Sequence, residues 1–446
     1  MTHGKIRVIG AGLAGSEAAW QAARLGAEVD LYEMKPKKFT PAHHTETFAE
    51  LCCSNSLRSA QLSNAVGVLK EELRRLGSLV MEAADHTSVP AGGALAVNRE
   101  DFSAYITRKI LSHPQISVHS EEVTELLPED GITVVATGPL TSGAMSDAIT
   151  RLTGSEGLHF YDAAAPIVDR ASIDFSKAFF ASRYGKGNQE DYLNCPMTEA
   201  EYDAFYHALI SAELAPLKEF DAVSQKDLTV FEGCMPVEVM AQRGYDTLRF
   251  GPMKPVGLPV PATGKDAFAT VQLRRENIEG TMYNIVGFQT HLTFPEQRRV
   301  FRMIPGLQDA EFLRYGVMHR NTYLHSPGFL QSTYATIPYP NLYFAGQMTG
   351  VEGYVESASS GFLAGVNAAR RALALPPIAF DSTTVIGALG GYVSSGTQSK
   401  FQPMNANFGI LAPLERKVKG GKQARNEAYA ARSLAEIDRI CEAYFS

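Results

Sequence analysis

A glycine-rich turn between an apolar strand and an alanine-rich helix constrains this chain more than any other feature. The stretch IRVI, Ile6–Ile9, is mostly β-branched and apolar, which predicts a buried strand. It is followed by G-x-G-x-x-G over Gly10–Gly15 and by a run rich in the strong helix former alanine, up to about residue 25. In this pattern the first glycine permits a tight turn, the second lets the backbone approach a pyrophosphate, and the third lets the helix pack on the strand.

An acidic residue at the end of the next predicted strand strengthens this interpretation. The strand 28–32 ends at Glu33, eighteen residues after Gly15, where a carboxylate can accept hydrogen bonds from ribose hydroxyls. The helix N-terminus offers free N–H groups and a positive dipole to phosphate. Glycines also punctuate ordinary turns, so the alternative is a strand–turn–helix without a ligand. The predicted cofactor-binding residues are Gly10, Ala11, Gly12, Leu13, Ala14, Gly15 and Glu33.

A second glycine-rich joint lies far along the chain. NLYFAG, residues 341–346, predicts a strand, and a helix of small residues is expected over 357–373. A flavin protein uses such a second joint near its ring and pyrophosphate, whereas a simple NAD-dependent dehydrogenase does not need one. FAD is therefore favoured over NAD as the tightly held cofactor, with Gly346 and Gln347 as further contacts.

The middle of the chain differs in character from both ends. Aromatic, proline and charged residues are interleaved over about 155–330, and long helical periodicity is scarce. We therefore predict an α/β protein with a Rossmann-type FAD-binding domain and an inserted mixed α/β domain. The predicted segments are 1–154 (first part of the FAD-binding domain), 155–330 (inserted substrate domain) and 331–446 (second part, with a basic tail and a C-terminal helix).

Composition limits the classes of protein to which this chain can belong. The net charge is −7, so an anionic partner would have to meet local basic patches. We see no signal peptide and no apolar run as long as a membrane span. The five cysteines lack disulfide-framework spacing, which suits a reducing cytoplasm, and no C-x-x-C pair with nearby histidines predicts a zinc site.

Three cysteines stand out by their surroundings. Cys52 and Cys53 open the polar stretch CCSNSLRS, in which Arg58 could lower a thiol pKa. Cys234 lies between a glycine and a Met-Pro pair that pin the local backbone. Because cysteine is among the most buried residue types, the residues alone leave packing and reactivity both open.

Two histidines and one basic run are the remaining candidates. His291 and His319 lie among aromatic residues, where a histidine is either a structural hydrogen-bonding residue or a stacking partner for a flat heterocycle. The run after Glu415 is either a phosphate-backbone contact or a solvated loop. Its candidate residues are Arg416, Lys417, Lys419 and Lys422.

Long motifs give the chain a family resemblance. They include GAGLAGSEAAWQAARLG, CSNSLRS, NAVGVLKEELR, FEGCMPVEVMA, VGFQTHLTFPEQRRVF, YGVMHRNTY, FAGQMTGVEGYVESA and FQPMNANFGI. With these, the chain resembles the folate- and FAD-dependent tRNA uracil-5-methyltransferases, the TrmFO (Gid) family, from about residue 5 to residue 440. The related GidA/MnmG proteins carry an extended C-terminal helical domain, whereas only about a hundred residues follow Gly346 here.

The resemblance implies an activity and roles for individual residues. The family methylates carbon 5 of the T-loop uridine of tRNA, taking carbon from methylenetetrahydrofolate and reducing equivalents from NADPH or NADH through FAD. Its two cysteines fall on Cys53 and Cys234, and Cys52 stands where the family pattern has an aliphatic residue. We expect Cys234 to attack uracil and Cys53 to serve the flavin side or as acid/base group.

The remaining expectations concern folate and partners. His319, ahead of His291, is expected to stack on folate, and the T-arm of tRNA is the expected macromolecular partner. No obligate protein partner and no membrane is inferred. The rival hypothesis is a small-molecule flavin oxidoreductase without an RNA substrate, which the net acidity favours mildly.

Overall fold

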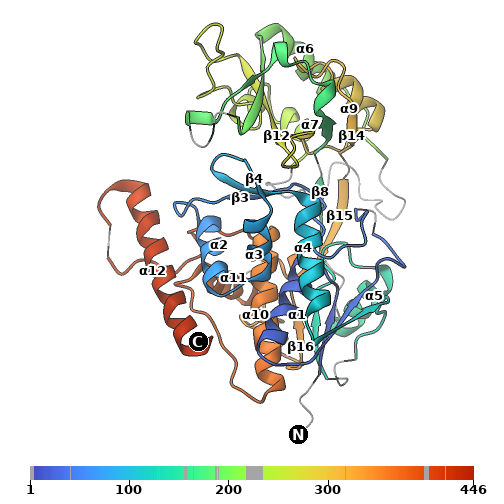
Figure 1. The fold of residues 1–446 in the computed structure, drawn as a ribbon, viewed down its shortest axis with the longest axis vertical. Helices are drawn as coiled ribbons and strands as arrows, with labels where there is room; N and C mark the ends of the chain where they lie inside the picture. Colours follow the sequence, from blue (N-terminus) through green and yellow to red (C-terminus); the bar gives the residue numbers. More distant parts are fainter. Residues whose placement is uncertain are drawn as a thin grey trace.

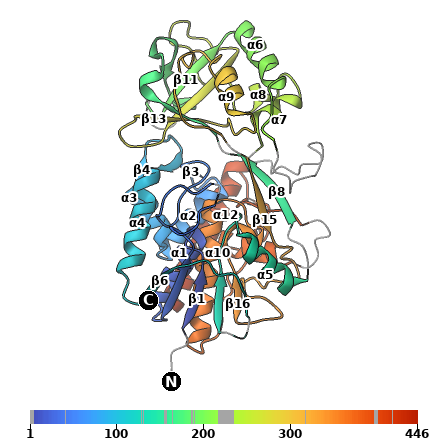
Figure 2. The same cartoon turned by 90° about the vertical axis from the view of Figure 1, so that its right-hand side faces the viewer.

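The computed structural model describes most of the chain as two packed units, one above the other in Figures 1 and 2. In strands 158–163 and 318–323 only the side chain of Tyr323 is described. The described residues are 5–40, 42–127, 129, 131–154, 158–163, 165–185, 188, 190–216, 235–316, 318–395, 401–416 and 418–445.

The lower unit is built on a parallel sheet with the glycine-rich strand at its centre. The strand order is β16-β7-β1-β2-β6, and every neighbouring pair is parallel. The glycine-rich strand, IRVI, is mostly buried, as is expected of a parallel strand covered on both faces. The α/β class with a Rossmann-type sheet is thereby confirmed. The strands are β1 (Ile6–Ile9), β2 (Val29–Glu33), β6 (Ile116–Ser120), β7 (Ile132–Val135) and β16 (Leu342–Phe344).

Two helices from opposite ends of the sequence pack closely against each other beside this sheet. They are α1 (Leu13–Arg24) and α10 (Tyr354–Ala372), which lie side by side in Figure 1. A Cβ atom on Gly361 would lie 2.2 Å from the carbonyl oxygen of Ala14, and one on Gly365 would lie 2.4 Å from that of Ala18. These glycines therefore set the close approach that brings residues after 346 to the N-terminal turn.

Further helices and a small sheet complete the lower unit. The sheet has the order β3-β5-β4 and lies beneath the upper unit in Figure 1. Among the described helices, none has the length and apolarity needed to span a membrane. The elements are β3 (Ser56–Ser59), β4 (Ser88–Val89), β5 (Ala94–Val97), α2 (Ala65–Arg75), α3 (Leu79–His86), α4 (Arg99–Ser112), α5 (Gly143–Thr153), α11 (Val385–Ser394) and α12 (Gly421–Tyr444).

The upper unit has its own sheet and its own core. The strand order is β10-β11-β12-β13-β9-β14, all antiparallel, and a separate cluster of buried residues includes Tyr202, Phe205 and Phe288. The elements are β9 (Ile167–Asp169), β10 (Phe179–Phe180), β11 (Tyr192–Met197), β12 (Ala269–Arg275), β13 (Met282–Ile285), β14 (Phe312–Arg314), α6 (Glu199–Ile210), α7 (Val237–Gln242), α8 (Thr247–Phe250) and α9 (Phe294–Phe301).

A two-stranded antiparallel ribbon runs between the two units. It pairs β8 (Leu158–Ala163) with β15 (Met318–Tyr323), and Figure 2 shows both strands extending from one unit to the other. The chain thus leaves and re-enters the lower unit at one place. This arrangement supports an insertion, and the segment boundaries 1–154, 155–330 and 331–446 remain a proposal.

A buried carboxylate on α2 ties the C-terminal helices to the lower unit. Glu72 accepts hydrogen bonds from the backbone N–H groups of Val385 (2.7 Å) and Ile386 (2.9 Å) at the start of α11. It also accepts a hydrogen bond from the Ser433 hydroxyl on α12. Burial raises the pKa of Glu72 from its ordinary 4.5 to about 7.

Replacing this carboxylate is expected to remove a pH dependence of stability. Because the pKa of Glu72 is higher in the folded chain, folding takes up a proton between about pH 4.5 and 7. Its contribution to the free energy of unfolding therefore falls as pH rises, by up to about 1.4 kcal/mol per pH unit. The measurement is the free energy of unfolding in urea at pH 5 and at pH 7.5. From the lower to the higher pH, the value for Glu72→Gln should rise relative to that of wild type by roughly 2–3 kcal/mol. Glu71→Gln, which replaces a partly exposed carboxylate, is the control. An equal change of its free energy of unfolding between the two pH values would contradict this assignment.

Candidate functional site

One cleft in the lower unit gathers most of the residues that the sequence singled out. Its empty volume, with the open solvent at its mouth included, is about 1400 Å³. It runs along the glycine-rich turn after β1 and past the end of β2. Of the predicted site residues, its lining includes Gly10, Ala11, Gly12, Leu13, Ala14, Glu33, Cys53, Gly346 and Gln347.

The three glycines of the first turn differ in what a side chain at each position would meet. Gly10 has φ +97°, and a Cβ there would lie 2.6 Å from the carbonyl oxygen of Ala136. A Cβ on Gly15 would lie 1.8 Å from the carbonyl oxygen of Gly10, so Gly15 serves helix packing and does not line the cleft. Gly12 has an ordinary φ of −71°, and a Cβ there would meet no atom within 4 Å. Only Gly12 therefore leaves space on the cleft side that a ligand can use.

The N-terminus of α1 and Glu33 together fit the phosphate and ribose of a dinucleotide. Gly12 caps the helix without a side chain, so the first-turn N–H groups face the cleft with no capping partner. The buried carboxylate of Glu33 accepts hydrogen bonds from the N–H groups of Ala11 (2.9 Å) and Lys35 (3.0 Å). These bonds fix the orientation of the carboxylate, and its remaining lone pairs can accept hydrogen bonds from hydroxyl groups.

The second glycine-rich joint reaches the same cleft from β16. Gly346 has φ +87° and donates its N–H to the Ser360 hydroxyl at 2.7 Å, which anchors the joint to α10. The Gln347 amide donates to Glu352 at 2.7 Å, and Gln347 lines the cleft. A parallel-sheet fold thus brings two joints, more than 300 residues apart in the sequence, to one ligand site.

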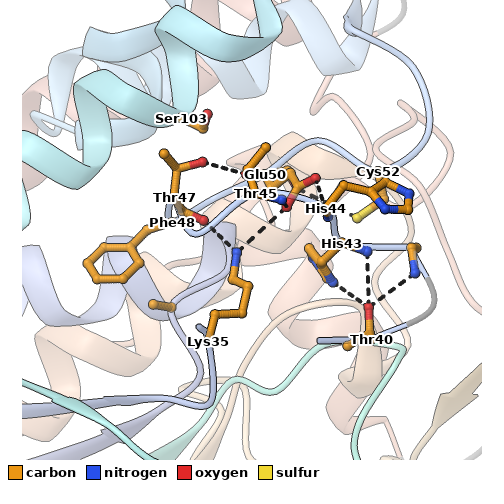
Figure 3. Close-up of polar contacts among 12 residues, drawn as sticks. Lys35, Thr40, His43, His44, Thr45, Thr47, Phe48, Glu50, Cys52 and Ser103 are labelled. Carbon is orange, nitrogen blue, oxygen red and sulfur yellow. Dashed lines mark hydrogen bonds and ion pairs between the residues drawn. The ribbon is translucent and has the colours of Figure 1, made fainter. Parts of the chain in front are cut away.

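A polar wall that the sequence analysis did not single out lies opposite the glycine-rich turn. Figure 3 shows the Lys35 ammonium donating to the carbonyl oxygen of Thr47 and lying 3.7 Å from the Glu50 carboxylate. Thr40 and His43 share a hydrogen bond of 2.6 Å. Burial lowers the pKa of His43, so the imidazole is neutral at pH 7. The signal in the sequence was the polar stretch TPAHHT.

The two adjacent cysteines both line the cleft. The N–H of Cys53 donates to the Tyr354 hydroxyl at 2.8 Å, which ties this residue to the start of α10. Burial, followed by the Glu50 charge, raises the pKa of Cys52 to about 12. Cys52 is therefore a protonated thiol at neutral pH and a weak nucleophile.

Arginines from both units hold the main chain of this cysteine pair. Arg99 donates to the carbonyl oxygen of Cys53 at 3.0 Å and is paired with Glu276 at 3.1 Å. Arg314 at the end of β14 donates to the same carbonyl oxygen at 3.1 Å and also to that of Cys52. The upper unit thus contacts the cysteine turn directly.

The role predicted for Arg58, lowering the pKa of a nearby thiol, stays a prediction. Its guanidinium forms an ion pair with the fully buried Glu356, and the main charges that act on Cys52 are those of other residues. The charges that do lower the pKa of Cys52 come from Arg99, Arg314 and Lys35, against the larger opposing effect of burial.

Several predicted residues lie elsewhere. His291 is buried in the upper unit, donates its backbone N–H to Glu238 at 2.7 Å and does not line the cleft. His319 lies on β15 opposite Asp162, and its side chain is not described. Cys234 and Lys417 lie outside the described residues. Exposed positions at or just before the N-terminus of α12 are occupied by Arg416, Lys419 and Lys422.

The described residues contain no group of three or more His, Cys, Asp or Glu side chains arranged to hold a metal ion. Beside the polar wall, the cleft offers backbone N–H groups at two glycine-rich joints and the buried carboxylate of Glu33. That set suits a dinucleotide with phosphates and ribose hydroxyls.

Fold and site together define a Rossmann-type dinucleotide-binding protein of the GidA class. The family model described as "Glucose inhibited division protein A" matches residues 5–376. Two crystal forms of GidA from Aquifex aeolicus superpose with a TM-score of 0.70 at 18% and 19% identity, covering 98% of this chain and 73% and 76% of the GidA chains.

Closer relatives define the family within that class. The chain is 59% identical to "Methylenetetrahydrofolate--tRNA-(uracil-5-)-methyltransferase TrmFO" of Heliobacterium modesticaldum, over 98% of this chain and 97% of the relative. The identity to the proteins of the same name is 59% for Acetivibrio thermocellus and 58% for Listeria monocytogenes, each over 98% of this chain and 99% of the relative. The chain belongs to the TrmFO family.

Proposed function

We propose that this protein methylates carbon 5 of the T-loop uridine of tRNA, giving ribothymidine. Methylenetetrahydrofolate would supply the carbon, and NADPH or NADH would supply the reducing equivalents through bound FAD. The observation that carries the proposal is a single cleft in which Cys53 lies with both glycine-rich joints. We further propose a cytoplasmic location and no obligate protein partner.

The residues of the cleft fit FAD, and each has a distinct part in holding it. The turn Gly10–Ala14 and the N-terminus of α1 would hold the pyrophosphate, and Glu33 would accept a ribose hydroxyl. Gly346 and Gln347 would contact the cofactor from the opposite joint. Bound FAD, once reduced, would supply the electrons that convert a methylene group into a methyl group.

The cysteines provide the chemistry that uracil needs. Carbon 5 of uracil is a poor nucleophile until a thiolate adds to carbon 6 and turns the ring into an enolate, which can form the bond to the incoming carbon. A base then removes the proton from carbon 5 and the carrier of the methylene group leaves, which gives an exocyclic methylene. Addition of a hydride equivalent would form the methyl group, and the thiolate leaves as the carbon 5–carbon 6 double bond re-forms. We assign the attack to Cys234 and the proton transfer to Cys53.

The surroundings of Cys53 support a positioned acid/base group. Its main chain is held by the Tyr354 hydroxyl on one side and by Arg99 and Arg314 on the other. These three bonds fix the residue relative to the cleft. For folate, we propose His319 ahead of His291, because His291 is buried away from the cleft.

The decisive assay incubates the protein with an unmodified tRNA transcript, methylenetetrahydrofolate and NADPH, and measures ribothymidine by nucleoside mass spectrometry. A transcript with cytidine at the T-loop position and a reaction without folate are the controls. NADPH oxidation at the same rate with and without tRNA, and no ribothymidine, would favour the small-molecule oxidoreductase instead.

The basic tail is expected to contribute to tRNA affinity. Weaker tRNA binding is expected when glutamine replaces Arg416, Lys417, Lys419 and Lys422. The slope of log affinity against log salt concentration should also become shallower, by up to about one per lost phosphate contact. Reduction of flavin by NADPH should not change. The affinity is measured by filter binding from 50 to 200 mM salt, beside a variant that neutralises four cations already in surface ion pairs, Lys5, Lys109, Lys177 and Arg439. An unchanged slope would identify the run as a solvated loop.

A further inference from the structure

Three aromatic rings form an exposed stack on the upper unit. Tyr315 lies between Phe294, at 4.6 Å and an interplanar angle of 16°, and Phe312, at 5.3 Å and 9°. Phe294, the first residue of α9, is 52% exposed. We call these three residues the aromatic shelf. Its outer ring presents a flat apolar face to solvent.

The shelf is held in place by buried polar contacts. The fully buried Gln297 side chain donates to the carbonyl oxygen of Gly316 and accepts its N–H, both at 2.8 Å, which fixes the residue after Tyr315 against α9. The Tyr315 hydroxyl accepts a hydrogen bond from Arg298 at 2.6 Å. The rings are therefore pre-ordered, so that little conformational entropy is lost when another ring stacks on them.

The charge beside the shelf is positive, although the whole chain is acidic. Helix α9 carries Arg298 and Arg299 within its last turn, and Arg302 follows directly. Its one carboxylate, Glu296, is bound by Arg299 at 2.6 Å. Arg302 donates to the carbonyl oxygen of Ala310, and no carboxylate of the described residues forms an ion pair with Arg298. An exposed ring thus lies beside a guanidinium that no described carboxylate neutralises.

The shelf is directly connected to the cysteine turn. Tyr315 follows Arg314, whose guanidinium donates to the carbonyl oxygen of Cys53 at 3.1 Å. Strand β14 and the residue after it therefore carry both Arg314, which contacts the cysteine turn, and two of the three shelf residues. A ligand on the shelf would lie on the unit that contacts the site proposed for catalysis.

We propose that the aromatic shelf stacks on an unpaired nucleobase of the tRNA substrate, with Arg298 contacting a neighbouring phosphate. The inference rests on the proposed function. Bases that are out of a helix are recognised by stacking on aromatic side chains, whereas the bases inside a duplex are already stacked. A ring with a free face and an adjacent cation matches the two parts of a single-stranded nucleotide.

The first test separates stacking from charge by tRNA affinity. Phe294→Ala should raise the Kd for unmodified tRNA about 5- to 150-fold, the effect of one stacked base, without changing the salt slope. Arg298→Gln should lower the salt slope by about one. Phe294→Trp should restore affinity because it keeps the aromatic face.

The matched control for this test is Phe250→Ala. Phe250 is 83% exposed on the same unit and has no ring partner among the described residues. Its removal should leave the Kd unchanged. An unchanged Kd in Phe294→Ala, or an equal loss in Phe250→Ala, would overturn the proposal.

The second test observes the contact without turnover. The chain has one tryptophan, Trp20, so a Trp20→Phe/Phe294→Trp protein carries its only indole on the shelf. Its fluorescence should be quenched by tRNA and by a single-stranded oligouridine, and not by a duplex RNA of equal length.

Other occupants of the shelf would give different results. Quenching by methylenetetrahydrofolate alone would assign the shelf to folate, and a concentration-dependent mass that falls in Phe294→Ala would assign it to a second copy of the chain. Either result would overturn the proposal. Because these arms measure binding alone, a protein that binds RNA on the shelf but makes no ribothymidine would contradict the proposed reaction and leave the shelf assignment standing.

Discussion

Cys53→Ala is expected to lose tRNA methylation while Cys52→Ala keeps it. Loss of a positioned acid/base group should lower the rate about 10²- to 10⁴-fold. Cys52 has a pKa raised to about 12 and is protonated at neutral pH, so its removal should affect packing alone. The measurement is ribothymidine formed per folded, flavin-loaded protein, which corrects for a cavity cost of about 1–3 kcal/mol in either variant.

Covalent trapping distinguishes the roles of the two proposed catalytic cysteines. Fluorine at carbon 5 of uracil blocks the deprotonation that releases the thiol, so tRNA carrying 5-fluorouracil should accumulate as an adduct on denaturing gels. Cys234→Ala should bind this tRNA and accept electrons from NADPH, yet form no adduct. An adduct that persists in Cys234→Ala and vanishes in Cys53→Ala would reverse the assignment, and full turnover in both variants would exclude covalent thiol catalysis.

Gly12→Val is expected to yield a folded protein without FAD. The backbone of Gly12 is in an extended conformation, φ −71° and ψ −168°, which valine adopts readily. No protein atom lies within 4 Å of the new Cβ, so the side chain would occupy the space proposed for the pyrophosphate. We expect the purified variant to lose the yellow colour and the roughly one FAD per chain of the wild type, with its circular dichroism unchanged.

The control for this prediction is Gly391→Val, in which the Cβ also meets open space, on helix α11 away from the cleft. That protein should keep its flavin. Gly15→Val is a different kind of variant, because its Cβ would collide with the Gly10 carbonyl oxygen at 1.8 Å and impair folding. Retained flavin in folded Gly12→Val would count against the placement of the pyrophosphate.

Local pattern predicted the elements that carry the cofactor site. The first turn, both flanking strands and the start of α1 follow from β-branched residues, glycine spacing and alanine content, which act over a few residues. The predicted C-terminal helix begins at Gly421 in the structure, so that Lys422 of the basic tail is helical. Helix ends are set by caps and contacts that periodicity does not report.

The local sequence pattern did not predict which residues, distant in the chain, contact each other in the fold. Arg274 is buried in the upper unit and donates to Ser54 (2.9 Å) and Asn55 (2.8 Å) in the other unit. Arg99 and Arg314 hold the cysteine turn from elements some 46 and 261 residues away from Cys53. Buried charges need partners, but the sequence does not say where those partners lie.

The sequence by itself determined the Rossmann-type fold, both glycine-rich joints and the family, because each is written in short, contiguous residue patterns. Only the tertiary structure decided that the two joints share one cleft, that Cys52 is a partly buried, protonated thiol and that Arg58 is paired with Glu356. It also decided that three aromatic residues from separate segments form a shelf. The physical reason is that burial and electrostatic environment are sums over neighbours in space, and chain order fixes those neighbours only after the sheet and its helices have packed.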